Sequence, residues 1–250
     1  MSGHSKWSTI KRKKGATDAK RGKIFTRLAR DIVMAAKESG GDEESNAKLK
    51  LAIAKAKAEN MPKDNIDRAI QRGSGKSDGI EMEEMTFEGY GLEGVAFIVD
   101  TFSDNKNRTL AEVKRVFSRA GGAMATAGSV AWQFEQKGYI ELEGEGLDFD
   151  DVFMVAAEAG ADDVSNEDGT IVVYTPREMF GAVEQALTDG GYKIADSELR
   201  WEAKNETEVG AEKAAQNLRL MNDLEELDDV QSVASNLLIT DEALAAFETA

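Results

Sequence analysis

The chain of 250 residues contains no cysteine, a single histidine (His4) and two prolines. The absence of cysteine excludes disulfides, thiolate nucleophiles and cysteine-based zinc sites. With one histidine, no pair of imidazoles can hold zinc. No apolar run approaches the roughly 20 residues that a membrane-spanning helix needs. We therefore expect no metal, no cofactor and no membrane partner.

Motifs for catalysis are equally scarce. The GKS at 75–77 has Ile70 where a phosphate-binding loop needs glycine, and a predicted helix precedes it, which indicates a linker. The acidic clusters lack the spacing of a calcium-binding loop, and no pair of acids is singled out for acid–base catalysis. His4 lies among basic residues, where contact with a phosphate or a base is the better role. We predict that the protein is not an enzyme and has no catalytic residues.

Charge is divided unevenly along the chain. The formal net charge is -16, yet residues 1–76 hold 19 basic and 9 acidic side chains. The remaining 174 residues hold 12 basic and 38 acidic ones. Such a division predicts a binder oriented by electrostatics. The acidic part is expected to face away from a polyanion or to meet a different partner, such as a protein.

The first thirty residues, here called the basic arm, contain ten lysines or arginines and one acid, Asp18. Solvated surfaces usually mix charges of both signs, so this segment indicates a polyanionic partner, most commonly nucleic acid. Each basic side chain can neutralise a phosphate and release counterions. We predict that the phosphate contacts are Lys6, Lys11, Arg12, Lys13, Lys14, Lys20, Arg21, Lys23, Arg27 and Arg30.

Trp7 lies among these basic residues and is the eleventh candidate contact. An aromatic ring beside cations can stack on an unpaired base, which contributes roughly 1–3 kcal/mol. The same ring could instead be a hydrophobic anchor that docks the arm on the helical domain that follows. The sequence leaves both interpretations open.

Helical periodicity dominates the first part of the chain. Apolar residues from Phe25 to Ala36 recur at helical spacing, and Gly40-Gly41 is a natural end. Further helices are predicted at 44–60 and 63–72, and 73–79 has the composition of a linker. Three short helices of this kind can pack as a small bundle.

After the linker the pattern changes to strands at 85–91 and 95–103. A helix follows, for which Thr109 and Glu112 suggest a capping box and Leu110 belongs to the predicted buried stripe. The segment SVAWQFE at 129–135 is predicted to be a strand.

Residues 138–203 follow the order β-α-β-β-α-β, which is typical of a ferredoxin-like unit. A helix at 211–226 and a strand at 230–239 cannot belong to that finished unit, so we expect them to complete the sheet begun at residue 85. The prediction is an α+β protein with three domains. These are a basic arm and helical domain (1–78), a discontinuous α+β domain (79–136 and 204–250) and an inserted ferredoxin-like domain (137–203).

The string MSGHSKWSTIKRKKGATDAKRGKIFTRLAR closely resembles the opening of the YebC/PmpR family. Later segments resemble family signatures in the family's order: ENMPKDNIDRAIQRG, FEGYG, DNKNRTLAEVKRVFSRAGG, GSVAWQFEQKG and DGGY. The resemblance implies the same three-domain architecture. It also implies nucleic-acid binding, since members are described as DNA-binding transcriptional regulators. A mitochondrial relative, and bacterial ones, resemble translational activators that work on mRNA or the ribosome.

The leading hypothesis is therefore a DNA-binding transcriptional regulator that acts through residues 1–30 and the adjoining helical surface. The alternative is a translation factor that binds ribosomal RNA or mRNA, for which stacking by Trp7 would suit single-stranded RNA. An acidic protein-interaction module is the third hypothesis. The start has no apolar segment followed by a small-residue cleavage site, so we expect a cytoplasmic protein.

Overall fold

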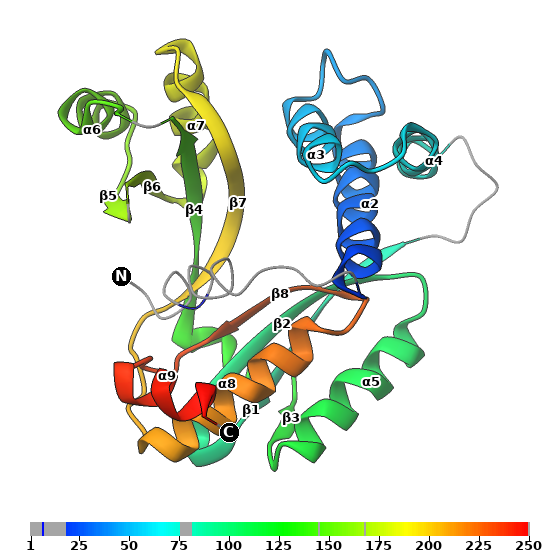
Figure 1. Ribbon diagram of the computed structural model, residues 1–250, viewed down its shortest axis with the longest axis vertical. Helices are drawn as coiled ribbons and strands as arrows, with labels where there is room; N and C mark the ends of the chain where they lie inside the picture. The colour runs from blue at the N-terminus through cyan, green and yellow to red at the C-terminus, as the bar shows by residue number, and fades with distance from the viewer. Residues whose placement is uncertain (1–6, 8–18, 76–81, 145, 168, 250) are drawn as a thin grey trace. The chain divides into compact units, whose positions relative to one another are not determined.

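The computed structural model describes residues 7, 19–75, 82–144, 146–167 and 169–249, with the backbone only for 19–23 and 167 (Figure 1). The chain divides into two compact units. The main unit is Met1–Ala131 with Asn205–Ala250, and the inserted unit is Trp132–Lys204. Each unit has its own antiparallel sheet, which confirms the predicted α+β class.

The N-terminal part of the main unit is a domain of three helices, as predicted: α2 (Ala19–Ser39), α3 (Ala47–Ala58) and α4 (Lys63–Gly73). Their apolar stripes meet in one core, in which Ile32, Leu49 and Ile53 are almost completely buried. Met82 and Phe102, from the polypeptide that follows, complete this core. The helical domain therefore packs on the next domain through its hydrophobic side chains.

The side chain of Asn46 determines where α3 begins. Its Oδ1 accepts the Leu49 N–H at 2.9 Å, and its Nδ2 donates to the carbonyls of Ala35 and Gly40, both at 2.8 Å. Asn46 is 2% exposed, so its amide satisfies free backbone groups at the end of α2 and the start of α3. The helix consequently starts at Ala47, later than the predicted 44.

The sheet of the main unit has the strand order β3-β1-β2-β8 and is antiparallel throughout. Its strands are β1 (Glu83–Tyr90), β2 (Ala96–Ser103), β3 (Ala123–Ala125) and β8 (Val230–Ser235). The pairing of β8 with β2 confirms that the C-terminal segment completes the sheet begun near residue 85. The inserted unit therefore interrupts this domain between β3 and the segment that leads to β8.

Helices α5 (Lys106–Arg119) and α8 (Ala211–Glu225) pack on the sheet (Figure 1). Phe97 of β2 and Phe117 of α5 meet edge to face, with ring centroids 6.0 Å apart. Leu218 and Met221 of α8 join the same core. A short helix that the sequence did not predict, α9 (Asp241–Glu248), covers α8 with Ala243 and Phe247.

The start of α5 differs from the prediction. Its cap is Asn105, whose side chain accepts the Arg108 N–H at 3.0 Å, and the helix begins at Lys106. Thr109 therefore lies inside the first turns, where its hydroxyl donates to Asp229 at 2.7 Å, and the predicted capping box is wrong. Leu110, predicted to be buried, is 39% exposed, because the buried stripe runs through Thr109, Val113, Val116 and Phe117.

The segment 129–135 is not a strand along its length. Glu88 of β1 accepts the N–H groups of Gly128, Val130 and Ala131, and a 3₁₀ turn follows at Ala131–Gln133. Burial opposes the charge of Glu88, but these three donors outweigh it and lower the pKa of the carboxyl. Backbone donors that bind a carboxylate cannot join a ladder, so the strand begins only at Phe134.

The inserted unit has the strand order β5-β6-β4-β7, which is the ferredoxin-like arrangement. Its elements follow the predicted sequence: β4 (Phe134–Glu143), α6 (Phe149–Glu158), β5 (Asp163–Glu167), β6 (Thr170–Pro176), α7 (Phe180–Asp189) and β7 (Lys193–Ala203). Ile140, Val152, Val173 and Val183 join both helices to the sheet. The unit begins at Trp132, whereas the predicted boundary was 137.

A glycine allows α4 to approach α2 closely. A Cβ on Gly73 would collide with the carbonyl oxygen of Val33 and lie 2.7 Å from the Cβ of Ala36. We expect Gly73→Ala to lower the free energy of unfolding by about 1–3 kcal/mol, because the helices must separate. Urea denaturation followed by circular dichroism measures this effect.

The matched control is Gly181→Ala, in α7, where a Cβ would have no neighbour within 4 Å. This variant should equal the wild type or gain about 0.4–1 kcal/mol, because alanine reduces the freedom of the unfolded chain. Equal stability of Gly73→Ala and the wild type would contradict the proposed close approach.

Candidate nucleic-acid interface

Helix α2 carries the last five cations of the basic arm. It begins at Ala19, so Lys20, Arg21, Lys23, Arg27 and Arg30 belong to one continuous helix. The side chains of the first three lie outside the described part of the chain, as do Lys6, Lys11, Arg12, Lys13 and Lys14 altogether. For these eight residues phosphate binding stays a prediction.

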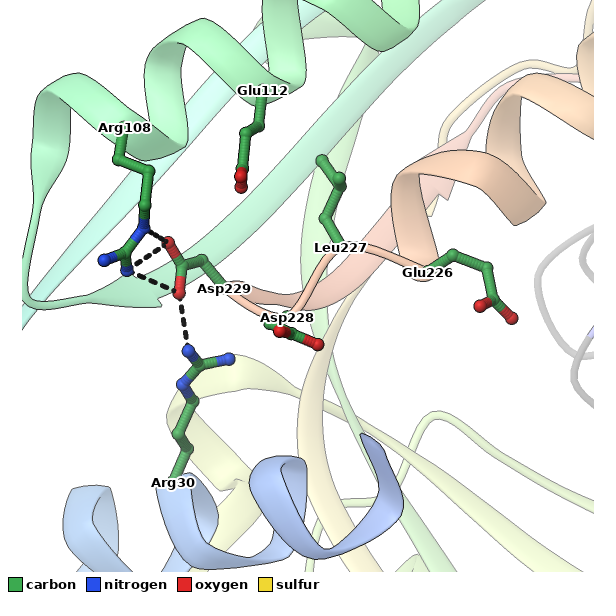
Figure 2. A pocket seen from close by; sticks show the side chains of 7 residues that line it. All are labelled: Arg30, Arg108, Glu112, Glu226, Leu227, Asp228 and Asp229. Atoms are coloured by element: carbon green, nitrogen blue, oxygen red, sulfur yellow. Dashed lines mark hydrogen bonds and ion pairs between the residues drawn. The ribbon is translucent and has the colours of Figure 1, made fainter. Parts of the chain in front are cut away.

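Arg30 is bound to a buried carboxylate in the main unit. Its Nη2 lies 2.5 Å from Oδ1 of Asp229, which is 2% exposed and directly precedes β8. Arg108 of α5 approaches the same carboxylate from another side, with its Nη2 2.8 Å from Oδ2 (Figure 2). The hydroxyls of Ser103 and Thr109 donate to Oδ2 at 2.9 and 2.7 Å. We call these five residues the Asp229 cluster.

The cluster explains how an acid is kept charged inside the protein. Burial disfavours the ionised form of Asp229, but the hydrogen bonds from Thr109, Arg108 and Ser103 and the charge of Arg30 outweigh burial and lower its pKa. Burial likewise lowers the pKa of Arg30, although Asp229 opposes that effect. Both groups therefore depend on each other to stay ionised away from water.

This geometry changes the interpretation of two predicted phosphate contacts. The Arg30 guanidinium is only 13% exposed and is engaged with Asp229, so it already has an internal counter-charge. Arg27 donates from Nη2 to the backbone carbonyl of Glu225 at 3.2 Å. Arg27 and Arg30 therefore fasten α2 to the C-terminal end of α8 and to the residue before β8.

Trp7 is buried in the core of the α+β domain. Its side chain is 3% exposed, and its ring meets Phe247 of α9 edge to face with centroids 5.4 Å apart. Its Nε1 donates to the carboxylate of Glu225 at 3.2 Å. The structure supports the anchor and not the stacking interpretation. It also corrects the location, because Trp7 docks against α8 and α9 instead of the helical domain.

A cleft of about 490 Å³ lies beside the Asp229 cluster (Figure 2). Its lining contains two cations, one leucine and four acids: Arg30, Arg108, Leu227, Glu112, Glu226, Asp228 and Asp229. Because both arginines are already paired with Asp229, an entering phosphate would face an excess of negative charge. The cleft is therefore unsuited to nucleic acid.

Four of the eight remaining described cations of the helical domain are lysines of α3, which contains no acid. Lys48 pairs with Glu38 at 2.7 Å, and Lys57 lies 3.8 Å from Glu43. Lys50 is exposed and belongs to no ion pair within the described ranges. Exposed pairs of this kind contribute at most about 1 kcal/mol, so a phosphate can compete with them.

The inserted unit offers a poorer surface. Tyr139 and Tyr174 lie opposite each other on its central strands, positions from which aromatic rings bind RNA in some ferredoxin-like domains. Here the Arg200 guanidinium lies 3.3 Å from the centroid of the Tyr139 ring, which is 2% exposed. The unit holds 18 acidic and 5 basic residues. A base would have to displace Arg200 on a negatively charged surface.

Within the described ranges, no three acidic or histidine side chains are grouped as metal ligands, and no helix has the length and apolar character to cross a bilayer. Sequence reasoning missed the Asp229 cluster entirely. Asp228-Asp229 has the composition of a solvated acidic turn, and the donors to Asp229 come from residues at least 120 positions away in the chain. No local pattern could have revealed it.

Replacing Asp229 tests the cluster. We expect Asp229→Asn to lower the free energy of unfolding by about 3–5 kcal/mol, since it leaves Arg30 buried without a counter-charge. The folded-state pKa of Asp229 is lowered, so its contribution is present above the unfolded pKa and is lost as the pH falls through the folded pKa. Denaturation at a series of acidic pH values should show a flatter loss of stability for the variant.

Its control is Asp228→Asn, which removes the same charge from an exposed neighbour. Its stability should stay within about 0.5 kcal/mol of the wild type. Equal effects of the two substitutions would contradict the role of Asp229.

Tryptophan fluorescence distinguishes the two interpretations of Trp7. The chain has three tryptophans, so Trp132→Phe with Trp201→Phe leaves Trp7 alone. Because its ring is 3% exposed, we expect weak quenching by acrylamide and no further quenching by single-stranded oligonucleotides. A variant that retains only Trp132, which is 68% exposed, should be quenched strongly and serves as the control. Saturable quenching of Trp7 by an oligonucleotide would restore the stacking interpretation.

Two family models match the chain, one over the helical domain and the other over most of the rest. Residues 5–76 match the family model for the TACO1/YebC protein N-terminal domain, and residues 82–237 match that for the TACO1/YebC second and third domain. A probable transcriptional regulatory protein of Acidithiobacillus ferrooxidans is 52% identical over 248 residues, 99% of either chain. One of Desulforapulum autotrophicum is 48% identical over 246 residues, 98% of this chain and 100% of the other.

A solved structure shares the fold. The crystal structure of a conserved hypothetical protein from Aquifex aeolicus superposes with a TM-score of 0.80 and 39% identity. The match covers 91% of this chain and 94% of the other. Together the two family models span most of the sequence, and the relatives match almost their full length. The chain belongs to the TACO1/YebC family.

Proposed function

We propose that this protein regulates gene expression by binding nucleic acid through its basic N-terminal region, most directly as a transcriptional regulator on duplex DNA. The observation that carries the proposal is the ratio of ten cations to one acid in the first thirty residues of a chain with net charge -16. Phosphate neutralisation supplies most of the affinity of such a segment. The names of the relatives, probable transcriptional regulatory proteins, favour a regulatory role.

The fold supports the proposal by fixing the base of the arm. Trp7 is buried against α9, and Arg27 and Arg30 fasten α2 to the segment before β8. The backbone of Lys20, Arg21 and Lys23 thereby belongs to a helix whose direction is fixed. A positioned row of cations loses less conformational entropy on binding than a free tail would.

The alternative is a translation factor that binds ribosomal RNA or mRNA. It rested on the resemblance to translational activators and on stacking by Trp7. Because Trp7 is buried, stacking on RNA no longer supports this alternative. We therefore keep DNA binding as the leading hypothesis. Partner binding that persists after removal of residues 1–20 would instead favour a protein-interaction module.

Substitution of the arm tests the proposal. Replacing Lys11, Arg12, Lys13 and Lys14 with alanine should lower the slope of log affinity against log salt by about 0.9 for each phosphate of B-DNA that is no longer neutralised. The measurement is fluorescence anisotropy on a labelled duplex over a salt series. The control replaces four cations elsewhere, Arg177, Lys193, Lys204 and Lys213, and leaves the same net charge. An unchanged slope for the arm variant would exclude the arm as the binding site.

Sedimentation separates the two targets. Under the DNA hypothesis the protein should be absent from ribosomal fractions at physiological salt. Co-sedimentation with ribosomes that is abolished by removal of residues 1–20 would favour the translational alternative.

A further inference from the structure

Helix α5 is a positive element in the acidic part of the chain. Residues 77–250 contain twelve basic side chains, and five of them lie within the fourteen residues of α5. The helix contains one acid, Glu112. A general need for solubility cannot explain this concentration, because the surrounding acids already provide a large net charge.

The helix presents these cations to solvent. Thr109, Val113, Val116 and Phe117 form its buried stripe, so the other side faces outward. Lys106, Lys114, Arg115 and Arg119 are all exposed. Arg115 and Arg119 are one helical turn apart, a rise of about 6 Å, and Arg108 lies two turns before Arg115 on the same side.

Four of the five cations of α5 have no side-chain partner in the described part of the chain. Among the residues that the structure describes, Lys106, Lys114, Arg115 and Arg119 form no ion pair or hydrogen bond through their side chains. Arg108 alone is engaged, by Asp104 at 2.9 Å and Asp229 at 2.8 Å. No described acid neutralises these four cations, and an external anion can bind them.

Stabilisation of the helix does not explain why these four cations lie on α5. A cation in the last turn interacts favourably with the helix dipole, which explains Arg119 by about 0.3–1 kcal/mol. Lys106 is the first residue of the helix, where the dipole disfavours a positive charge. Lys114 and Arg115 lie in the middle, where the dipole has little effect.

We propose that the exposed face of α5 is a second contact with the phosphate backbone of the nucleic acid. This inference rests on the proposed function and adds a surface to it. Charge complementarity favours a phosphate backbone over a protein, because the cores of protein interfaces are depleted of charge and rich in aromatic side chains. The α5 face holds one large apolar residue, Leu110, which is 39% exposed.

The Asp229 cluster couples the two positive surfaces. One carboxylate binds Arg30 of α2 and Arg108 of α5, so the two helices are held together in the main unit. The last part of the basic arm lies on α2, and the exposed cations Lys114, Arg115 and Arg119 follow Arg108 on α5. A nucleic acid bound by α2 thus has a second, fixed row of charges within the same unit, and its affinity gains from both.

The test compares two double variants of the full-length protein. Arg115→Gln with Arg119→Gln removes two charges from α5, and Arg177→Gln with Lys193→Gln removes two exposed charges from the inserted unit. Their net charges are equal. On a short duplex of mixed sequence, the α5 pair should lower the salt slope by about 1.8 and the control pair should leave it unchanged. Arg115→Lys with Arg119→Lys keeps the charges and should keep the slope.

The possible outcomes separate this inference from the proposed function. If the α5 pair keeps the wild-type slope while the arm variant lowers it, the α5 contact is overturned and the proposed function stands. If the wild-type protein retains neither duplex DNA nor single-stranded RNA, both proposals fail. If the α5 pair changes the sedimentation mass of the protein but not the slope, α5 binds a second copy of this chain and the inference is overturned.

Discussion

The carboxylate of Asp229 is the interaction on which the arrangement of the main unit depends. Its donors come from the end of β2, from the first turns of α5 and from the middle of α2. A buried charge without such donors would cost several kcal/mol, so the protein must keep these segments together wherever Asp229 stays buried. An apolar contact tolerates small shifts, whereas directed hydrogen bonds from four side chains specify one geometry.

This constraint organises the charge of the whole protein. Arg30 and Arg108 both neutralise Asp229 inside the protein, although the sequence counts them simply as two basic residues. Trp7 and Arg27 add two more internal contacts near the C-terminal end of α8. Trp7 and Arg27 thus hold part of the basic arm against the α+β domain. They are an aromatic and a basic residue, the types that in the sequence suggest contact with nucleic acid.

Sequence patterns predicted those elements whose cause is local. The stripe of Leu49, Ala52, Ile53 and Ala56 defined α3, and alternating runs predicted the β-α-β-β-α-β order of the inserted unit. The errors have distant causes. Thr109 has the local pattern of a cap, and its actual partner, Asp229, lies 120 residues later in the chain. The strand expected at 129–135 is shorter because Glu88 accepts the N–H groups of its first residues. For Trp7 the two roles were equally compatible with its neighbours, and its contact with Glu225 lies 218 residues away.

A count of charged residues therefore gives the net charge of a segment but does not show which cations lack an internal ion pair. The ten cations of the first thirty residues include two that the structure uses internally. In contrast, α5 was overlooked because it lies in a segment of negative net charge, yet four of its five cations are unpaired among the described residues. Binding depends on cations that have no internal counter-charge, since only these gain a partner when a phosphate arrives. The sequence indicated one candidate surface, the basic arm, and the exposed cations of α5 add a second candidate to it.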